Sequence, residues 1–317
     1  MLRADVTVVI PAYGPSPYLP QVIEALQSQI PQPTAIAVAH SGPSDPTERL
    51  SRAHPDVQVL HRSQRMFAGT ARNLGLREAH TEWVAFLDSD VVPAPGWLAA
   101  LLDTAHAAPD RFVVGAIDYE VSGGYWGLCR WAIEFSGVHP YLPDGEVQGG
   151  ASANLLVRTA DVRRAGGFDE NFAAGEDSLL AARLRGAGLE NWFCAAARGG
   201  HVNIPGLRHC LSHLFWLGNW SVRCRRRVKL RGSAAAHIWP LALGLWTAKL
   251  VLIYARVMRW GKGQRLLFLA LAPGIAFGLL AWNYGFLRGL VETNDETPEA
   301  DEAEQKIAAP TAHGIGH

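Results

Sequence analysis

Cysteine is scarce in this sequence, and its four residues are widely scattered: Cys129, Cys194, Cys210 and Cys224. No two of them have the close spacing typical of a zinc site or a redox-active dithiol. A secretion signal is also lacking, because the apolar run at the N-terminus is short and Pro11 ends it. These absences favour a reducing compartment, and we expect the first domain to lie in the cytosol.

An excess of one charge is missing as well, with Lys+Arg 29 against Asp+Glu 29 in 317 residues. This balance argues against a general nucleic-acid binder, and we expect no nucleic-acid partner. It hides two local runs: six basic residues without an acid from Arg223 to Arg231, and seven acids without a base from Glu292 to Glu304. With 49% hydrophobic residues, the chain is long enough for one large α/β domain plus an appendage, or for two small domains.

Short apolar runs alternate with helical patterns in the first third of the chain. The expected strands are Thr7–Ile10, Ile36–Ala39, Val57–Leu60, Trp83–Leu87 and Phe112–Ile117. The expected helices are Tyr18–Gln29, Thr47–Ala53, Thr70–Glu78 and Trp97–Ala107. This alternation predicts an α/β fold with a mostly parallel sheet flanked by helices. Ligands of such sheets bind beyond the carboxyl ends of the strands, so residues 11–14, 40–45 and 88–90 should converge.

Two carboxylates, Asp88 and Asp90, follow the apolar strand Trp83–Leu87. Residues two apart at a strand end point to the same side, and hard divalent cations bound to a diphosphate prefer oxygen ligands. The pair therefore suits Mn²⁺ or Mg²⁺, although a turn or a helix cap would use the same residues.

A second acid pair, Glu176 and Asp177, precedes the expected helix Ser178–Arg185. Acids in this position stabilise the helix dipole by about 1 kcal/mol. Alternatively, one of them is a general base that removes a proton from an acceptor hydroxyl. A structural cap is the simpler interpretation of this pair taken alone.

Five blocks occur in order along the chain: Val8–Tyr13, Gly69–Gly75, Phe86–Asp90, Gly166–Glu170 and Gly175–Asp177. Together with Arg183, Leu184 and Gly188, they resemble glycosyltransferase family 2, over Val6 to about His201. The resemblance implies a GT-A-like domain over residues 1–207, a nucleotide-diphospho-sugar donor, and Mn²⁺ or Mg²⁺ as cofactor. It also implies inversion of the anomeric configuration without a covalent enzyme intermediate.

The resemblance assigns roles to individual residues. The implied donor-binding residues are Pro11, Ala12, Tyr13, His40, Ser41, Arg72, Asn73, Asp88 and Ser89. Asp90 and Asp88 would bind the cation, and Asp177, with Glu176, would be the catalytic base. His201 falls where similar transferases place a third metal ligand, although a lone histidine is more often only hydrogen-bonded within a fold.

The segment from Glu120 to Gly150 is rich in glycine and aromatic residues and has no clear period. It either shapes an acceptor pocket or packs in the core. Gly149, Gly150 and Asn154 are the candidate acceptor-side residues, because glycine lets a ligand approach the backbone closely. A tight turn is the alternative for the glycines.

Two positions depart from the family pattern. His40 and Ser41 stand where the family usually has an acid pair, and Gly14 replaces an expected asparagine. A carboxylate at the first position commonly accepts an N–H of the nucleobase. The identity of the base is therefore open, and uridine is not assumed.

The C-terminal third changes character. Residues 208–233 form a basic and aromatic juxtamembrane segment, in which cations would contact anionic headgroups. Two apolar stretches, Ala234–Ala255 and Leu266–Leu287, each approach the ~20 residues that cross a bilayer, so residues 234–290 are expected to form two membrane helices. A basic loop joins the stretches, so the first could lie in the interface instead. Residues 291–317 are expected to be a disordered acidic tail.

These observations predict an inverting glycosyltransferase at the cell membrane, with its catalytic domain on the cytoplasmic side. Its acceptor would be a polyprenyl phosphate or a cell-envelope glycan or glycolipid. The Gln-x-x-Arg-Trp block of chain-extending synthases is absent, which favours single transfers. The alternatives are a catalytically inactive membrane scaffold with the same fold, and a nucleotidyltransferase, although residues 12–16 lack the basic glycine-rich loop typical of that class.

Overall fold

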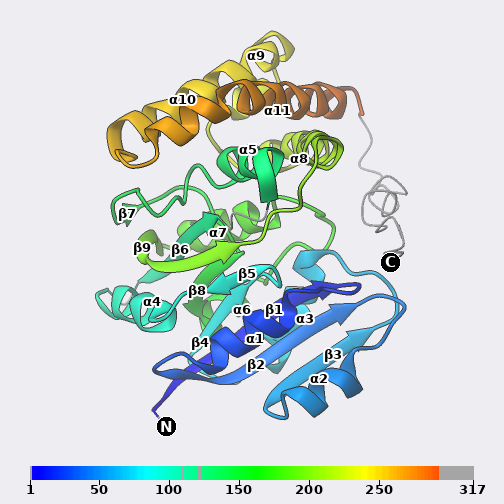
Figure 1. Cartoon of the computed structure of the whole chain (residues 1–317), viewed down its shortest axis with the longest axis vertical. Helices are drawn as coiled ribbons and strands as arrows, with labels where there is room; N and C mark the ends of the chain where they lie inside the picture. Colours follow the sequence, from blue (N-terminus) through cyan, green and yellow to red (C-terminus); the bar gives the residue numbers. More distant parts are fainter. Residues whose placement is uncertain (1, 109, 120–122, 293–317) are drawn as a thin grey trace, which may run out of the picture.

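A computed structural model describes residues 2–108, 110–119 and 123–292 (Figure 1). Its strands are β1 (Arg3–Tyr13), β2 (Gln32–Ser41), β3 (Val57–Arg62), β4 (Trp83–Leu87), β5 (Val91–Pro93), β6 (Arg111–Tyr119), β7 (Gly145–Glu146), β8 (Asn154–Arg158) and β9 (Glu190–His201). Its α-helices are α1 (Leu19–Gln27), α2 (Thr47–Ala53), α3 (Ala68–Glu78), α4 (Trp97–His106), α5 (Gly124–Glu134), α6 (Thr159–Arg164), α7 (Glu176–Gly186), α8 (Leu207–Arg227), α9 (Trp239–Leu243), α10 (Leu245–Trp260) and α11 (Arg265–Val291). A 3-10 helix, η2, covers Ser233–Ala236.

The strands form one sheet in the order β3-β2-β1-β4-β8-β6-β9-β5, and β7 pairs with β9. β3, β2, β1 and β4 are mutually parallel, as the sequence predicts. β8 runs antiparallel to both β4 and β6, so the sheet is mixed, although β1, β2, β3, β4, β6 and β9 all run in one direction. The α/β fold with a sheet flanked by helices is confirmed, and the expected strands and helices of the first third are all present.

The parallel half of the sheet is built from nearly continuous apolar runs. All five residues of β4 are buried, as is the stretch from Val6 to Ile10 in β1. Strands that are covered by helices on both faces have this composition, since no position faces water. β1 and β4 pair in parallel from Val6 opposite Trp83, so their carboxyl ends lie side by side.

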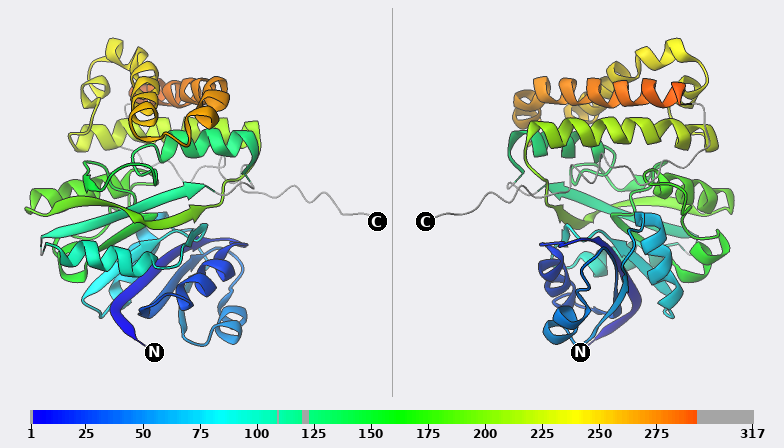
Figure 2. Two further views of the ribbon diagram at one scale, coloured as in Figure 1. Left: turned by 60° about the vertical axis from the view of Figure 1, so that its left-hand side comes forward. Right: turned by 90° about the vertical axis from the view of Figure 1, so that its right-hand side faces the viewer.

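The C-terminal helices form a layer on one side of the sheet. α8 and α5 lie nearest the sheet, α11 lies alongside α8, and α9 and α10 are outermost (Figures 1 and 2). The hydrophobic core is continuous through this layer and includes Val9, Leu214 and Phe286. The predicted boundary at residue 207 therefore does not separate two cores, and α8 belongs to the folded body.

The prediction of two membrane helices over 234–290 is wrong for the first of them. The stretch is broken into η2, α9 and α10, with Pro240 and Gly244 near the breaks. Within the described ranges, only α11 is long and apolar enough to cross a membrane, and 44% of its most apolar window is buried. All but the first two residues of the predicted acidic tail, 291–317, lie outside the described residues.

Candidate active site

A pocket of about 360 Å³ opens at the carboxyl ends of β1 and β4. Seven of the predicted site residues line it: Pro11, Ala12, Tyr13, Arg72, Asp88, Ser89 and Asp90. The remaining lining residues come from the segment before and within α3, from Ala173 and from Trp216 of α8. The first and fourth strands therefore supply one wall, as the sequence predicts for parallel strands.

Arg72 links two of the acids in the site. Its Nη2 donates to Asp88 Oδ1 over 2.6 Å, and its Nη1 donates to Glu176 Oε1 over 2.7 Å. The Arg72 side chain is only 4% exposed. Burial alone would lower the pKa of Arg72, but the charges of Asp88 and Glu176 outweigh it and raise that pKa. The guanidinium thus stays charged and holds the end of β4 against the start of α7.

The two acids of α7 differ in their surroundings. Glu176 is buried against Arg72, and burial raises the pKa of Glu176 to about 7 despite this pairing. Asp177 is partly exposed and accepts a hydrogen bond from the Ser178 backbone N–H over 2.6 Å. Burial raises the pKa of Asp177 too, while Arg72 opposes the shift. Asp177 is therefore the more accessible of the two carboxylates.

Gly150 lies against the start of α7. A Cβ at this position would lie 2.8 Å from the Asp177 carbonyl oxygen, which is closer than real contacts allow. The glycine thus lets the segment before β8 approach the candidate base. Gly149 has no side chain, but its carbonyl oxygen accepts a hydrogen bond from Asn191 Nδ2 over 2.6 Å.

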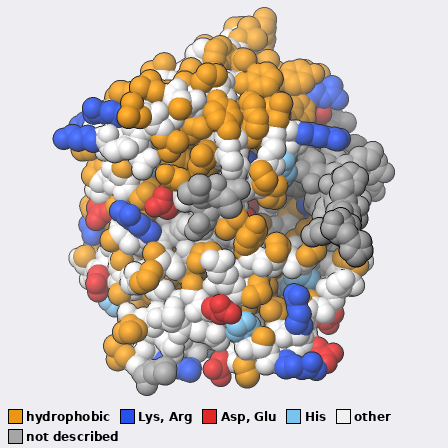
Figure 3. Space-filling view, viewed as in Figure 1, with side chains coloured by type: hydrophobic (Ala, Val, Ile, Leu, Met, Phe, Trp, Pro, Cys, Tyr) orange, Lys and Arg blue, Asp and Glu red, His pale blue; other side chains and the backbone are white. Residues whose placement is uncertain are grey.

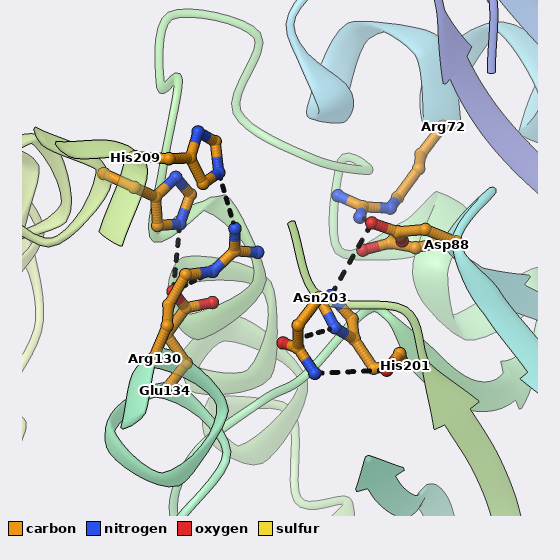
Figure 4. Close-up of polar contacts among 9 residues, drawn as sticks. Arg72, Asp88, Arg130, Glu134, His201, Asn203 and His209 are labelled. Atoms are coloured by element: carbon orange, nitrogen blue, oxygen red, sulfur yellow. Dashed lines mark hydrogen bonds and ion pairs between the residues drawn. The ribbon is translucent and has the colours of Figure 1, made fainter. Parts of the chain in front are cut away.

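Asp90, His201 and Asn203 form a second polar group, of which Figure 4 labels His201 and Asn203. β5 pairs antiparallel with β9, opposing Val91 to His201, and this pairing brings His201 Nε2 to 3.6 Å from Asp90 Oδ2. Asn203 Nδ2 donates to the His201 carbonyl, so its Oδ1, 3.0 Å from His201 Nδ1, accepts. This pattern places a proton on Nδ1 and leaves the Nε2 edge of the ring on the side of Asp90. Burial raises the pKa of Asp90, and His201 opposes the shift.

The predicted three-ligand metal set is not assembled. Over the residues that the structure describes, no group of three or more His, Cys, Asp or Glu side chains is suited to hold a metal ion. Asp88 Oδ1 is bonded to Arg72, which leaves Asp90 and His201 as the facing pair. The pair still fits a cation, because Mg²⁺ and similar ions are commonly held by one or two protein ligands plus substrate phosphates and water.

His40 and Ser41 do not line the pocket. His40 Nε2 lies 2.8 Å from the Gly14 carbonyl oxygen, and its Nδ1 lies 3.1 Å from His61 Nδ1. Burial lowers the pKa of His40, and His61 adds to this effect. His61 was not predicted, but it stands directly opposite His40 in the β2–β3 pairing, which only the sheet register reveals.

Two asparagines have structural roles instead of the predicted ones. Asn154 is fully buried: its Nδ2 donates to the carbonyls of Ala116 and Ala197, and its Oδ1 accepts from Trp97 Nε1. Because its amide is saturated inside the sheet, its acceptor-side assignment is wrong. Asn73 likewise exchanges two hydrogen bonds of 2.9 Å with the Phe168 backbone, and it does not reach the pocket as a donor ligand.

A buried polar cluster beside the pocket was missed. Glu134 of α5 lies 2.9 Å from Arg130 Nε and 3.0 Å from His213 Nε2, and Arg130 Nη1 lies 2.9 Å from His209 Nε2 (Figure 4). Burial would raise the pKa of Glu134, but Arg130 and His213 outweigh it and lower that pKa. Burial and Arg130 lower the pKa of His209 to about 4, so His209 accepts from Arg130 as a neutral ring. These residues fix α5 against α8 next to the pocket.

Residues 7–147 match the family model described as Glycosyl transferase family 2. The pre-mycofactocin glycosyltransferase of Mycobacterium tuberculosis is 32% identical over 265 residues, which cover 81% of this chain and 52% of that protein. This chain therefore spans about half the length of that relative. The N-acetylglucosaminyl-diphospho-decaprenol L-rhamnosyltransferase of the same organism is 26% identical over 225 residues, covering 60% of this chain and 73% of that protein.

Two solved structures are similar in fold. A mannosyltransferase of Pyrobaculum calidifontis, in complex with GDP-Man and Mn²⁺, is 19% identical with a TM-score of 0.58, covering 92% of this chain and 88% of that one. TarS 1-349 of S. aureus, in complex with UDP-GlcNAc, is 12% identical with a TM-score of 0.55, covering 90% of this chain and 91% of that one. At these identities the likeness concerns the fold alone, and it confirms the GT-A-like architecture.

Proposed function

Since the chain belongs to glycosyl transferase family 2, we propose that it transfers a sugar, with inversion, from a nucleotide-diphosphate donor to a membrane-associated acceptor. One observation carries the proposal: acids from distant segments meet at one buried guanidinium. Asp88 and Glu176 both bond to Arg72, although they are far apart in the chain. Asp90 and Asp177 each follow one of these residues closely, and the charges of Arg72 and Asp88 both act on Asp177.

The donor would lie in the pocket beyond β1 and β4. Arg65 and Arg72 line this pocket and supply positive charge for a diphosphate, and Arg65 lies over the Tyr13 ring at 4.7 Å. Pro11 and Ala12 give the nucleotide an apolar floor. His40 and His61 lie near the ends of the neighbouring strands β2 and β3, so the nucleobase would extend toward this side, where imidazoles stand in place of the carboxylate that commonly reads the base.

Asp90 and His201 would hold the divalent cation, Mn²⁺ or Mg²⁺, with Asp88 kept nearby by its bond to Arg72. When bound, the cation would neutralise charge on the departing nucleoside diphosphate. The Asn203 hydrogen bond keeps the Nε2 edge of the His201 ring on the side of Asp90. The protein thus presents one carboxylate and one imidazole facing each other.

Asp177 would act as the general base. It is partly exposed, and its raised pKa makes it a stronger base. The acceptor hydroxyl would lose its proton to Asp177 Oδ2 as its oxygen attacks the anomeric carbon, and the nucleoside diphosphate would leave on the opposite face. Glu176 is held by Arg72 and would position α7, not react.

The acceptor would enter between α7 and α8, where Ala173 and Trp216 line the pocket. An aromatic face at this point suits a sugar ring or an isoprenoid chain. The likeness to a protein named for transfer to a diphospho-decaprenol substrate supports a polyprenyl-linked or cell-envelope acceptor.

A donor screen tests the proposal. We expect one class of nucleotide sugar to raise the melting temperature of the purified protein only when Mn²⁺ is present, because a ligand that binds the folded form alone stabilises it. That donor should then release its nucleoside diphosphate slowly in water and faster with a lipid-linked acceptor. An inactive scaffold would release none, and a nucleotidyltransferase would instead form pyrophosphate from a nucleoside triphosphate and a sugar phosphate.

A further inference from the structure

The outer face of the C-terminal layer is apolar and uncovered. Large hydrophobic side chains of α9, α10 and α11 are exposed there, including Trp239 (66%), Val251 (67%) and Leu266 (82%). Hydrophobic side chains gather over this end of the molecule in Figure 3, with basic side chains at its two edges. A contiguous exposed apolar face of this kind marks an interaction surface. We call the exposed face of Trp239–Val291 the apolar cap.

The charge around the apolar cap has one sign. Between residues 191 and 291 the chain has fourteen Lys and Arg and no Asp or Glu. Arg259 and Lys262 are exposed at the turn between α10 and α11, and Arg226, Arg227, Lys229 and Arg231 are exposed beyond α8. An apolar face bordered by cations complements a bilayer surface that contains anionic lipids.

α11 is docked lengthwise onto α8. A Cβ at Gly218 would collide with the Trp282 carbonyl, and a Cβ at Gly285 would collide with the Phe215 carbonyl. A Cβ at Gly289 would lie 2.8 Å from the Asn219 carbonyl oxygen, which is also closer than real contacts allow. These glycines let the two backbones touch over several turns, and Figure 2 shows the helices side by side.

This docking conflicts with a bilayer crossing. α8 carries Trp216 in the wall of the pocket and a run of arginines at its C-terminal end. If α11 crossed the hydrocarbon while docked, it would draw α8 and its uncompensated charges into the hydrocarbon, which is strongly unfavourable. In addition, α11 is exposed on one side only, and Leu269 and Tyr284 lie on that side.

We propose that the protein attaches to anionic membranes in the plane of one leaflet, through the apolar cap, and that α11 does not cross the bilayer. This rests on, and deepens, the membrane association proposed above. α8 then separates the leaflet from the active site: Phe215, Gly218 and Asn219 face α11, while Trp216 faces the pocket. A lipid-linked acceptor would need to extend its headgroup past this helical layer, of which α8 is the part beside the pocket, to reach Asp177.

Cysteine accessibility tests the topology, because all four native cysteines are buried and give little background. K262C and R288C mark the two ends of α11, and E48C on α2 marks the catalytic domain. In sealed right-side-out and inside-out vesicles from an expressing host, we expect a membrane-impermeant maleimide to label all three from the same side. Labelling of K262C and R288C from opposite sides would overturn the proposal.

Vesicle flotation tests the surface. Purified protein should float with vesicles containing phosphatidylglycerol, and W239S/L243S should lose this binding. R259E/K262E should bind those vesicles at least about tenfold less, since each basic residue contributes about 1 kcal/mol near an anionic surface. R49E/R52E, with the same charge change on α2, is the matched control and should float like the wild type.

Two outcomes of flotation would refute the proposal that the apolar cap binds the membrane. In the first, W239S/L243S floats as the wild type does; in the second, the wild-type protein forms a dimer that covers the apolar cap and never floats. A failure of the membrane-binding proposal can be distinguished from a failure of the proposed glycosyltransferase activity. The cap variants should keep wild-type hydrolysis of the donor in water, which needs no membrane.

Discussion

The guanidinium of Arg72 donates to Asp88 Oδ1 over 2.6 Å, joining a helix beside the sheet to the acid that ends β4. Its other terminal nitrogen holds Glu176, so one cation fixes the geometry of both acid pairs. The end of β4 and the start of α7 are therefore joined by a buried residue whose role is not visible in the sequence motif alone.

Removing this cation should be costly. We expect R72A to lower the free energy of unfolding by about 3–5 kcal/mol, because it leaves Glu176 buried without its partner. R77A is the matched control: Arg77 is 60% exposed and 3.9 Å from Glu170, so its loss should change stability by less than about 1 kcal/mol. Urea unfolding of both variants gives these values. An R72A protein as stable as R77A would contradict the structural role of the bridge.

Asn203 should set the metal affinity through His201. We expect N203A to weaken Mn²⁺ binding about 10–100-fold, because the His201 ring loses the acceptor that fixes its tautomer. N203D retains an acceptor and should bind within a few-fold of the wild type. Electron paramagnetic resonance of Mn²⁺ gives the affinity, and ¹⁵N chemical shifts of the imidazole give the tautomer. If N203A leaves both unchanged, His201 is positioned by other contacts.

Acid should destabilise the protein through His139. This ring is fully buried against Trp131, at 4.1 Å between ring centroids, and burial lowers the pKa of His139 to about 3. In the unfolded chain His139 takes up a proton near pH 6.5, whereas in the folded protein it stays neutral down to about pH 3. The contribution of the neutral ring to the free energy of unfolding is therefore fully present above pH 6.5 and is lost as the pH decreases toward 3. By pH 5 this contributes a loss of about 2 kcal/mol.

H139F should remove that part of the pH dependence between pH 6.5 and 5, as measured by urea unfolding at each pH. His80 is exposed, so H80A is the control and should keep the wild-type slope. The account of His139 fails if H139F loses stability with acid as steeply as H80A does.

The sequence predicts the parallel half of the sheet well because each strand there is a continuous apolar run followed by polar residues. Trp83–Leu87 and the acids after it are the clearest case. β9 was missed because Ala195–Gly200 is small and irregular in pattern, and its strand character comes from pairing with β6. Long-range pairing of this kind leaves little local signal.

The candidate site, like the sheet, could be predicted from the sequence only in part. Asp88, Asp90 and Arg72 follow from motif and strand position, and they do line one pocket. Asn154 and Asn73 were misassigned because a motif gives the residue and not its hydrogen-bond partners. Trp216 was assigned to a membrane-facing segment because its aromatic and basic neighbours resemble a membrane anchor, whereas only the packing of α8 places it in the pocket wall.

The central claim is that Asp90 and Asp177 act on one bound donor in different ways. The most direct measurement is donor binding and turnover, each with Mn²⁺, in the wild type, D90N and D177N. We predict that D177N binds the donor within a few-fold of the wild type but turns it over about 10²–10⁴-fold more slowly, whereas D90N loses Mn²⁺-dependent binding itself. Wild-type turnover in D177N, or unchanged Mn²⁺-dependent binding in D90N, would contradict the account.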